Sequence, residues 1–201
     1  MSAPSVEFWF EFASTYSYPA AMRLERRSSA RDVTLVWRPF LLGPIFGAQG
    51  WRDSPFNIYP AKGHYMWRDL ERVCAKEGLP WRRPTRFPRS GLVAARVATA
   101  AGAEPWLPEF VRGVYHANFV EDREISEPAV VGNVLRSLGV DASEWLERAQ
   151  APAIKDGLRD ATESAQARGI FGAPSSVVDG ELFWGNDRLD DALEWARRAR
   201  V

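Results

Sequence analysis

The apolar and polar positions of this 201-residue chain change their period twice, from strand-like to helical and back again. Residues 6–12 (VEFWFEF) favour a strand and are apolar at nearly every position of one face, and residues 33–37 (VTLVW) favour a second strand. Between them, the apolar residues Ala20, Ala21 and Leu24 predict a helix. A strand, a helix and a strand in this order form a βαβ unit, which predicts a parallel sheet.

The middle of the chain carries helical patterns. Residues 39–60 are rich in glycine, proline and aromatic residues without clear periodicity, so they predict a long loop of the kind that tends to be functional. Helices are predicted over residues 62–76, 92–101, 105–119, 128–138 and 153–168. Ser126 is the predicted N-cap of the fourth, because Pro128 suits a first helical turn. Cys74 lies on the buried stripe of the first, which predicts a structural role.

The strand pattern returns near the end of the chain. Residues 176–184 (SVVDGELFW) predict a β-hairpin, because Asp-Gly stands between two apolar runs, and residues 187–200 predict a final helix. This element order is the layout of a thioredoxin-like α/β fold interrupted by an inserted all-helical subdomain. We predict one domain over residues 1–201, with its thioredoxin-like part at 1–42 and 170–201 and the helical insertion at about 60–168.

Composition narrows the possible partners and location. Lys plus Arg and Asp plus Glu both number 26, so the net charge is zero and no basic stripe favours nucleic acid. Five residues precede the first strand, and no apolar run of roughly 18 residues occurs, which predicts a cytoplasmic protein without a signal peptide or membrane span. The single cysteine excludes an internal disulfide and a cysteine-based metal cluster, and the two histidines are isolated, so we predict no metal site.

The most informative chemistry lies at Ser14-Thr15-Tyr16-Ser17, where thioredoxin-like redox proteins carry Cys-x-x-Cys. A strand-to-helix turn directs free N–H groups and the positive end of the helix dipole at one point, so it favours an anion. Because the turn has no sulfur, we expect the anion to be the thiolate of a small cofactor such as glutathione, held by the Ser14 hydroxyl. The alternative is that Ser14 is a plain N-cap, and both functions are compatible. Pro19 should then perturb the first turns of the helix.

Two further segments could bind the same ligand. Pro174, in residues 169–174 (GIFGAP), either simply starts a strand or exposes the backbone of Ala173 for pairing with a tripeptide such as glutathione. Residues 184–189 (WGNDRL) either cap the last helix through Asn186 or Asp187 or hold the two charges of a γ-glutamyl group. Lys62, near Asn57, is either a solvated surface charge or part of the site.

Five segments together resemble the 2-hydroxychromene-2-carboxylate isomerase family, which is related to kappa-class glutathione transferases and DsbA-like proteins. They are residues 10–18 (FEFASTYSY), 59–63 (YPAKG), 65–70 (YMWRDL), 171–174 (FGAP) and 179–189 (DGELFWGNDRL). The resemblance spans the whole chain and implies a DsbA-like thioredoxin fold, glutathione as cofactor and a homodimer.

The resemblance also implies roles for individual residues. Ser14 would be the catalytic serine that steadies the glutathione sulfur. The other implied cofactor contacts are Ala173, Pro174, Trp184, Gly185, Asn186 and Asp187. Implied positions near the substrate are Asn57, Lys62 and Arg89. The chain departs from the family pattern at Thr15, where a proline is usual, at Pro19, where leucine is frequent, and at Arg89, where asparagine is common.

The implied activity is glutathione-dependent isomerisation of 2-hydroxychromene-2-carboxylate or a related unsaturated aromatic 2-oxo acid. A thiolate would add to the conjugated carbon, the resulting single bond would rotate, and the sulfur would leave. Two alternatives stay open: a kappa-class-like transferase, which keeps the sulfur on the product, and a non-catalytic glutathione- or thiol-binding module. The missing cysteines argue against a disulfide oxidoreductase.

Overall fold

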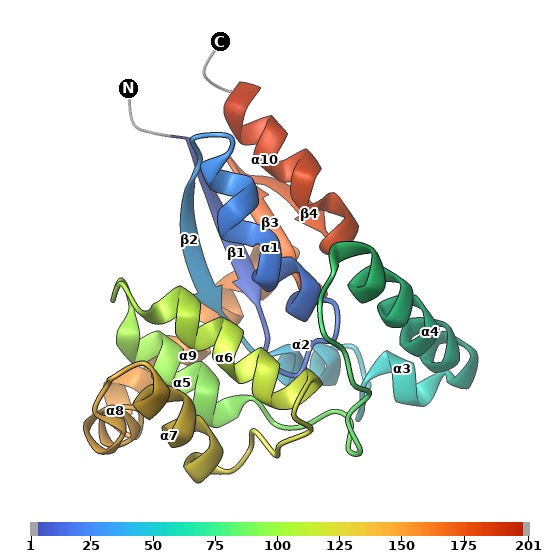
Figure 1. The fold of residues 1–201 in the computed structure, drawn as a ribbon. Coiled ribbons are helices and arrows are strands. Elements are labelled where there is room, and N and C mark those ends of the chain that lie inside the picture. Colours follow the sequence, from blue (N-terminus) through green and yellow to red (C-terminus); the bar gives the residue numbers. More distant parts are fainter. Residues whose placement is uncertain (1–3, 199–201) are drawn as a thin grey trace.

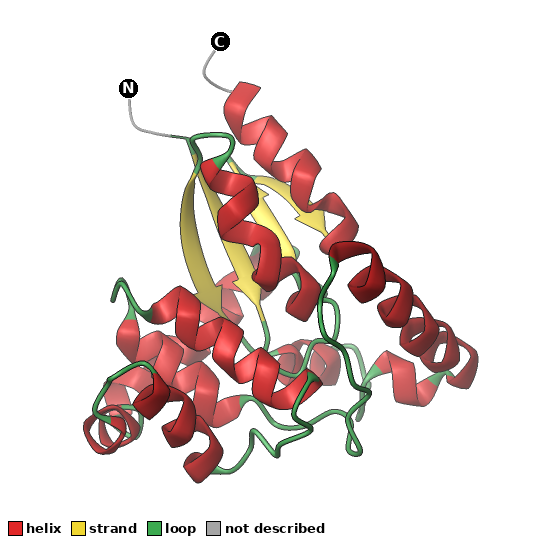
Figure 2. Ribbon diagram, viewed as in Figure 1, coloured by secondary structure: helices red, strands yellow, loops and turns green. Residues whose placement is uncertain are grey.

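A four-stranded mixed sheet lies at the centre of one half of the molecule (Figures 1 and 2), in a computed structural model that describes residues 4–198. The strands are β1 (Ser5–Phe10), β2 (Thr34–Pro39), β3 (Ser175–Val178) and β4 (Glu181–Trp184), in the order β2-β1-β3-β4. β1 and β2 are parallel, as the βαβ pattern predicts, whereas β3 is antiparallel to both of its neighbours. The neighbouring β1 and β3 come from opposite ends of the chain.

Helices flank the sheet and fill the other half. α1 (Ser17–Ser29) and α10 (Leu189–Arg198) lie along the sheet, and the short 3-10 helix η1 (Asn186–Arg188) precedes α10 (Figure 1). The remaining helices are α2 (Leu42–Ala48), α3 (Pro55–Ile58), α4 (Pro60–Glu77), α5 (Leu92–Ala101), α6 (Leu107–Phe119), α7 (Pro128–Ser137), α8 (Ala142–Arg148) and α9 (Pro152–Ala167). In Figure 1, α5 to α9 gather at the end of the sheet where β1 and β2 finish.

One hydrophobic core joins the sheet to the helical half. Trp37 of β2 packs edge-on against Phe8 and Phe10 of β1, with ring centroids 5.3 and 5.7 Å apart. Just beyond β1, the Phe12 ring lies 5.4 Å from the ring of Tyr115 on α6. Each of these rings buries a large apolar area and so stabilises the fold. The segment that leads from β1 into α1 therefore packs against α6.

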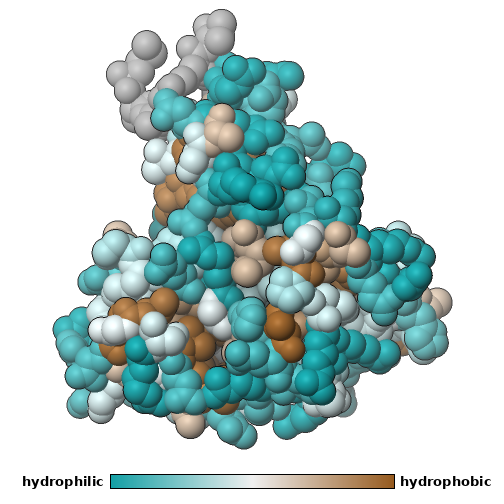
Figure 3. Space-filling view, in the orientation of Figure 1, coloured by the Kyte–Doolittle hydropathy of each residue, from teal (hydrophilic) through white to brown (hydrophobic). Residues whose placement is uncertain are grey.

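The surface is mostly polar. On the face seen in Figure 3, hydrophilic side chains cover most of the molecule and apolar side chains gather in separate patches. No helix in residues 4–198 combines the length and the apolar character needed to cross a membrane.

The predicted long loop over residues 39–60 is wrong, because α2 and α3 form within it. These helices have only 7 and 4 residues, which is too short to show an apolar period. The hydroxyl of Ser54 caps α3 by accepting the N–H of Phe56, and Pro55 occupies the first turn. The sequence also gave no prediction for α8, which is capped by Asp141.

Two predicted helix starts also differ from the structure. The N-cap of α7 is Glu127, not Ser126, whose hydroxyl instead donates to Glu124 Oε1 at 2.8 Å. α1 begins at Ser17 rather than directly after Ser14, which places Pro19 in its first turn. The missing N–H of a proline costs nothing there, because first-turn N–H groups lack helical partners.

Other predictions are confirmed. Asp179 and Gly180 both have positive φ values, 48° and 88°, as a tight hairpin turn requires. Cys74 is 1% exposed, and burial raises the pKa of its thiol to about 11, so it stays a protonated core residue. The predicted helix over 187–200 is observed as η1 and α10, and positions 199 and 200 lie outside the described residues.

Gly91, the residue before α5, allows a close approach to the segment after β1. A Cβ atom at Gly91 would lie 2.7 Å from the Cβ of Phe12 and 3.1 Å from Oε1 of Glu11. Gly91→Ala should therefore lower the free energy of unfolding by about 1–3 kcal/mol in a denaturant titration, the usual effect of overpacking. In the control Gly43→Ala, where nothing lies within 4 Å of the added carbon, stability should be unchanged or slightly higher. Equal stability of the two variants would contradict this account.

Candidate active site

Ser14 lies half-buried in the turn between β1 and α1. Its hydroxyl donates a hydrogen bond to the carbonyl oxygen of Ala173 at 2.8 Å and accepts the N–H of Ser17 at 3.3 Å. The second bond ties the hydroxyl to the start of α1, as a capping residue does, although Tyr16 is the residue directly before the helix. The hydroxyl thus connects two segments that are 159 residues apart.

Sheet register explains why these two segments meet. Trp9 of β1 pairs with Ser175 of β3, so the residues just before β3 lie beside those just after β1. This pairing brings together Ser14, Ala173 and Pro174, three of the predicted cofactor-binding residues. The peptide bond between Ala173 and Pro174 is cis.

The segment after β4 joins the same site. The N–H of Gly185 donates to the carbonyl of Pro174 at 2.9 Å, and Gly185 has a φ of 114°, which favours glycine. The indole of Trp184 covers Gly172, where an added Cβ would lie 2.4 Å from Nε1. Trp184 also packs against the ring of Phe171 at 4.8 Å. These contacts place residues 184–187, the predicted γ-glutamyl-binding segment, beside residues 171–174, which form the cis-proline loop.

Asn186 and Asp187 differ in their exposure. Asn186 is 8% exposed, and its carbonyl and side-chain oxygens accept hydrogen bonds from Arg23 of α1 at 2.5 and 3.0 Å. The Asp187 side chain is 75% exposed, and its Oδ2 lies 3.8 Å from Nε of Arg188.

Arg23 is a residue that the sequence analysis missed. It is 8% exposed and also forms an ion pair with Glu77 of α4 at 3.0 Å. It therefore fixes η1 to both α1 and α4. A single arginine in a helix gives no sequence signal of this kind, because its partners lie 54 and 163 residues away.

Tyr16 and Thr15 show how α4 reaches the turn. The Tyr16 phenol donates to Asp69 Oδ2 at 3.0 Å, and burial together with Asp69 raises the pKa of Tyr16 well above its usual range, so the phenol stays neutral. Thr15 is 2% exposed and donates to the sulfur of Met66 at 3.1 Å. Thr15, which stands where proline is usual in the family, therefore faces the interior.

The three residues that the resemblance places near the substrate lie in different environments. Asn57 is exposed and donates to Asp53 and to the carbonyl of Phe87 at 3.1 Å. Lys62 is exposed, with its ammonium group 4.9 Å from the ring centre of Tyr59. α3, which contains Asn57, reaches the turn through Phe56, whose ring lies 6.3 Å from that of Tyr16.

Arg89 is 4% exposed and its guanidinium group already has several partners. It donates to the carbonyl and side-chain oxygens of Asn118 at 3.2 Å and forms an ion pair with Asp122. These contacts tie the segment before α5 to the end of α6. Contact with a substrate would require Arg89 to leave them.

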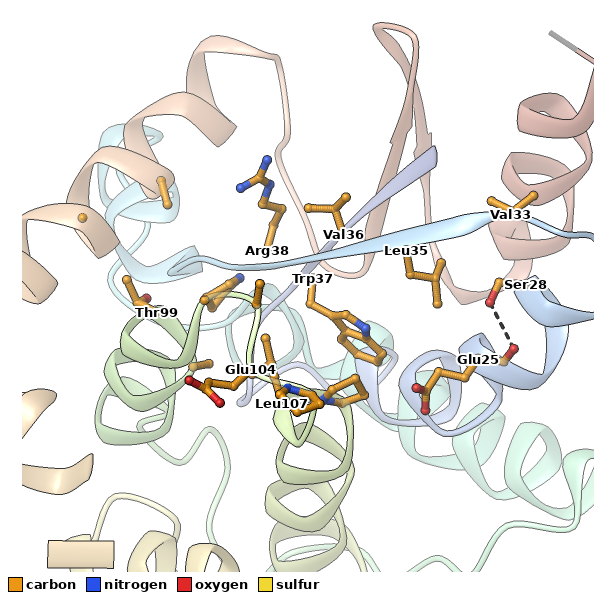
Figure 4. Close-up of a pocket in the computed structure, with 18 of the residues that line it drawn as sticks. Glu25, Ser28, Val33, Leu35, Val36, Trp37, Arg38, Thr99, Glu104 and Leu107 are labelled. Carbon is orange, nitrogen blue, oxygen red and sulfur yellow. Dashed lines mark hydrogen bonds between the residues drawn. The ribbon is translucent and has the colours of Figure 1, made fainter. Parts of the chain in front are cut away.

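Two of the hollows in the described part of the chain lie beside these elements. The smaller, of about 430 Å³, adjoins Asn186 and Asp187, and its other lining residues are Arg23, Arg27, Val73, Lys76, Glu77 and Asp190. Its wall thus carries charges of both signs. The larger, of about 690 Å³, runs along β2 between α1, α5 and α6 (Figure 4), and none of the predicted site residues lines it. Of these two, only the smaller hollow is lined by predicted site residues, namely Asn186 and Asp187.

Glu11 is a second residue that the sequence analysis missed. It is only 7% exposed, and its carbonyl oxygen accepts the Ser14 N–H and the Tyr115 hydroxyl, both at 3.0 Å. Burial raises the pKa of its carboxyl group to about 7, although the N–H of Ala13 opposes this shift. The available signal was a single acidic residue within the apolar run of residues 8–12 (FWFEF).

Comparisons with known proteins agree with this architecture. Residues 5–194 match the DSBA-like thioredoxin domain family. The chain is 32% identical to 2-hydroxychromene-2-carboxylate isomerase of Sphingobium xenophagum, over 92% of this chain and 94% of that protein. It is 28% identical to Glutathione S-transferase kappa 1 of Homo sapiens, over 92% of this chain and 88% of that protein.

A solved structure supports the same relationship. A 2-hydroxychromene-2-carboxylate isomerase superimposes with a TM-score of 0.87 and 25% identity, and the match covers 98% of this chain and 96% of that one. The relatives are isomerases and glutathione transferases, which supports an enzymatic function. The chain therefore belongs to the DSBA-like thioredoxin domain family and, within it, to the family of the 2-hydroxychromene-2-carboxylate isomerases.

Proposed function

We propose that this protein is a glutathione-dependent isomerase that acts on 2-hydroxychromene-2-carboxylate or a related unsaturated aromatic 2-oxo acid. The observation that carries the proposal is the position of the Ser14 hydroxyl, at the start of α1 and 2.8 Å from the Ala173 carbonyl. The isomerases among the relatives support the reaction class. The kappa transferases among them support glutathione.

The residues present fit a tripeptide thiol. The hydroxyl proton of Ser14 can rotate from Ala173 toward a sulfur atom while the Ser17 N–H keeps the oxygen in place. Exposed Asp187 suits the ammonium group of a γ-glutamyl end, and Lys76 in the adjoining hollow suits a carboxylate. When bound, glutathione would supply a thiolate that adds reversibly to the conjugated carbon of the substrate and allows bond rotation.

The energies involved are within the reach of this turn. A thiol with a pKa of about 8.5 is only a few per cent ionised at neutral pH, and lowering its pKa by about two units requires about 2.7 kcal/mol. A hydrogen bond to a charged group supplies about 1.5–3 kcal/mol, and a helix N-terminus adds about 0.3–1 kcal/mol. Together these contributions span about 1.8–4 kcal/mol, a range that includes the required amount, so Ser14 and the start of α1 can supply it.

Aromatic residues beside the turn suit an aromatic substrate. Phe171 and Trp184 are 46% and 52% exposed, although each is a large apolar side chain, and they border the cis-proline loop. Exposed aromatic surface of this kind favours stacking with a flat ring. We propose that these side chains contact the substrate. The homodimer and the cytoplasmic location also stay predictions.

A kappa-class-like transferase is the second candidate, because kappa transferases are 27–28% identical to this chain. It would use the same thiolate at Ser14, but the sulfur would remain on the product. A non-catalytic glutathione-binding module would show binding without turnover.

The reaction class can be tested with an authentic chromene carboxylate. We expect its absorbance to change only when both enzyme and glutathione are present, and we expect glutathione to be recovered unchanged. Mass spectrometry of the products distinguishes the candidates. A stable glutathione adduct would indicate a transferase. Flat absorbance traces with the chromene carboxylate and with related unsaturated aromatic 2-oxo acids would contradict the isomerase proposal.

Ser14→Ala tests the hydroxyl directly. The pKa of bound glutathione, followed by the ultraviolet absorbance of its thiolate, should rise by about 1–2 units because a hydrogen bond to a charged group is lost. Turnover at neutral pH should fall by about 10- to 100-fold. In the control Ser143→Ala, which alters an exposed serine of α8, neither quantity should change. Normal turnover with an unchanged thiol pKa in Ser14→Ala would exclude this role.

Arg23→Lys tests the support of the γ-glutamyl-binding segment. A lysine keeps the charge but loses the fork that reaches Glu77 and both oxygens of Asn186. The Kd for glutathione, measured by calorimetry, should rise by about 5- to 20-fold, while the pKa of the bound thiol stays the same. Arg26→Lys, at a side chain that is 72% exposed, is the matched control. If both variants bind equally well, Arg23 does not position Asn186.

A further inference from the structure

β2 is an edge strand, and its outer side has no neighbouring strand within residues 4–198 (Figure 1). The N–H groups of Thr34 and Phe40 donate to carbonyl groups at the two ends of the β1 segment. Because backbone groups alternate in direction along a strand, the even-numbered residues of β2 face β1. The N–H and C=O groups of Leu35 and Trp37 therefore point away from the sheet, and no hydrogen bond from another described residue reaches them.

The free part of this edge is short and has defined ends. The N–H of Val33 already donates to the carbonyl of Ser28 at 3.2 Å. At the other end, Pro39 has no N–H to offer. Leu35 and Trp37 are thus the residues of the edge that present both a donor and an acceptor. Unpaired backbone groups of this kind are a template for a further strand.

The side chains of β2 leave room for such a strand. Figure 4 shows Leu35 and Trp37 on one side of the strand and Val36 and Arg38 on the other. On the first side lies the larger hollow, of about 690 Å³, which α1, α5 and α6 also line. On the second side, Val36 is partly exposed and belongs to neither hydrophobic cluster. Added side chains can therefore pack beside the strand without displacing the core.

We propose that this edge binds the β2 edge of a second copy of the chain, in antiparallel orientation, so that the two sheets become one continuous sheet. When Leu35 lies opposite Trp37 of the second copy, every free N–H and C=O group of both edges is bonded. Either neighbouring register would place Val33 or Pro39 in the ladder, and neither of them has an N–H to give. In the favoured register, Val36 lies opposite Val36 of the second copy.

Side chains and charges agree with this register. Leu35 and Trp37 of the two copies meet beside the hollow, as an aliphatic–aromatic cross-strand pair of the kind that stabilises sheets. Arg38 is the charged residue of β2, and it lies opposite Thr34 of the second copy, so like charges do not face each other. The net charge of the chain is zero, so two copies do not repel each other at long range.

A second copy fits this edge better than the alternatives. A peptide of another protein would bond one free edge, whereas a second copy closes its own edge at the same time. β4 is the other edge strand of the sheet, but it carries Trp184 beside the candidate active site, which pairing would cover. The pairing at β2 needs neither glutathione nor turnover, so it is independent of the proposed function.

Sedimentation velocity with charged variants tests the contact. We expect the natural protein to be a dimer at about 100 μM. Val36→Lys and Val36→Glu each place two like charges about 4.5–5.5 Å apart across the axis, so each variant alone should be monomeric. An equimolar mixture of the two should recover the dimer, because opposite charges then meet. Ile58→Lys, at an apolar residue of α3 that is 38% exposed, is the control and should dimerise normally.

Three results would overturn the proposal. They are a natural protein that stays monomeric, Val36 variants that dimerise like the natural protein, and a dimer that is lost in Ile58→Lys but not in the Val36 variants. A synthetic peptide with the sequence of residues 34–39 distinguishes another occupant. If it protects the N–H groups of Leu35 and Trp37 from hydrogen exchange in a protein that is otherwise monomeric, the edge binds extended peptides instead.

A cysteine cross-link tests the register and covers the case in which the charged variants do not fold. Val36→Cys should form an intermolecular disulfide under mild oxidation, because opposite residues of such a pair have Cα atoms about 4.5 Å apart. In the control Thr34→Cys, the two cysteines of a dimer would lie about 13 Å apart along the strands and should not cross-link. The natural Cys74 is only 1% exposed. Equal cross-linking of the two variants, or none in Val36→Cys, would contradict the pairing.

Discussion

The hydrogen bond from the Ser14 hydroxyl to the Ala173 carbonyl is the contact on which the site depends. It joins the turn after β1 to the loop before β3, and the pairing of these strands makes it possible. A hydroxyl bonded to a carbonyl is a modest interaction, worth about 0.5–1.5 kcal/mol, so a charged ligand can replace it. The bond therefore joins the two segments without preventing the exchange with a charged ligand that the proposed function requires.

Buried polar residues support this turn from two sides. Arg23 ties α1, α4 and η1 together, and so fixes the segment that carries Asn186 and Asp187. Glu11 and Tyr115 lie under the turn and are bonded to each other through the Glu11 carbonyl. Neither group binds the cofactor in this account. They hold in place the segments that carry the proposed cofactor-binding residues.

The sequence was sufficient to predict the fold where the signal is local. The alternation in residues 6–12, the Asp179-Gly180 turn and the long apolar helix periods all correspond to observed elements. Short helices were missed because α2, α3 and α8 have 7, 4 and 7 residues, fewer than the pattern needs. The start of α1 was misplaced because Thr15 and Tyr16 form a turn between Ser14 and the first helical residue, Ser17.

The candidate site was predicted only in part, because the rest of it depends on long-range contacts. Ser14 and residues 173–174 and 184–187 carry motifs that can be read along the chain, and the structure brings these segments together. Arg23 and Glu11 carry no such motif, since burial and partners on other elements give them their roles. Arg89 is the opposite case. The resemblance placed it near the substrate, but its guanidinium group forms a buried ion pair with Asp122.

The most direct test of this account is a crystal structure of the complex with glutathione. We expect the sulfur within hydrogen-bond distance of the Ser14 hydroxyl, the tripeptide backbone along Ala173, and the γ-glutamyl end beside Asp187. A complex in which the Ser14 hydroxyl still donates to the Ala173 carbonyl while the sulfur lies elsewhere would contradict it.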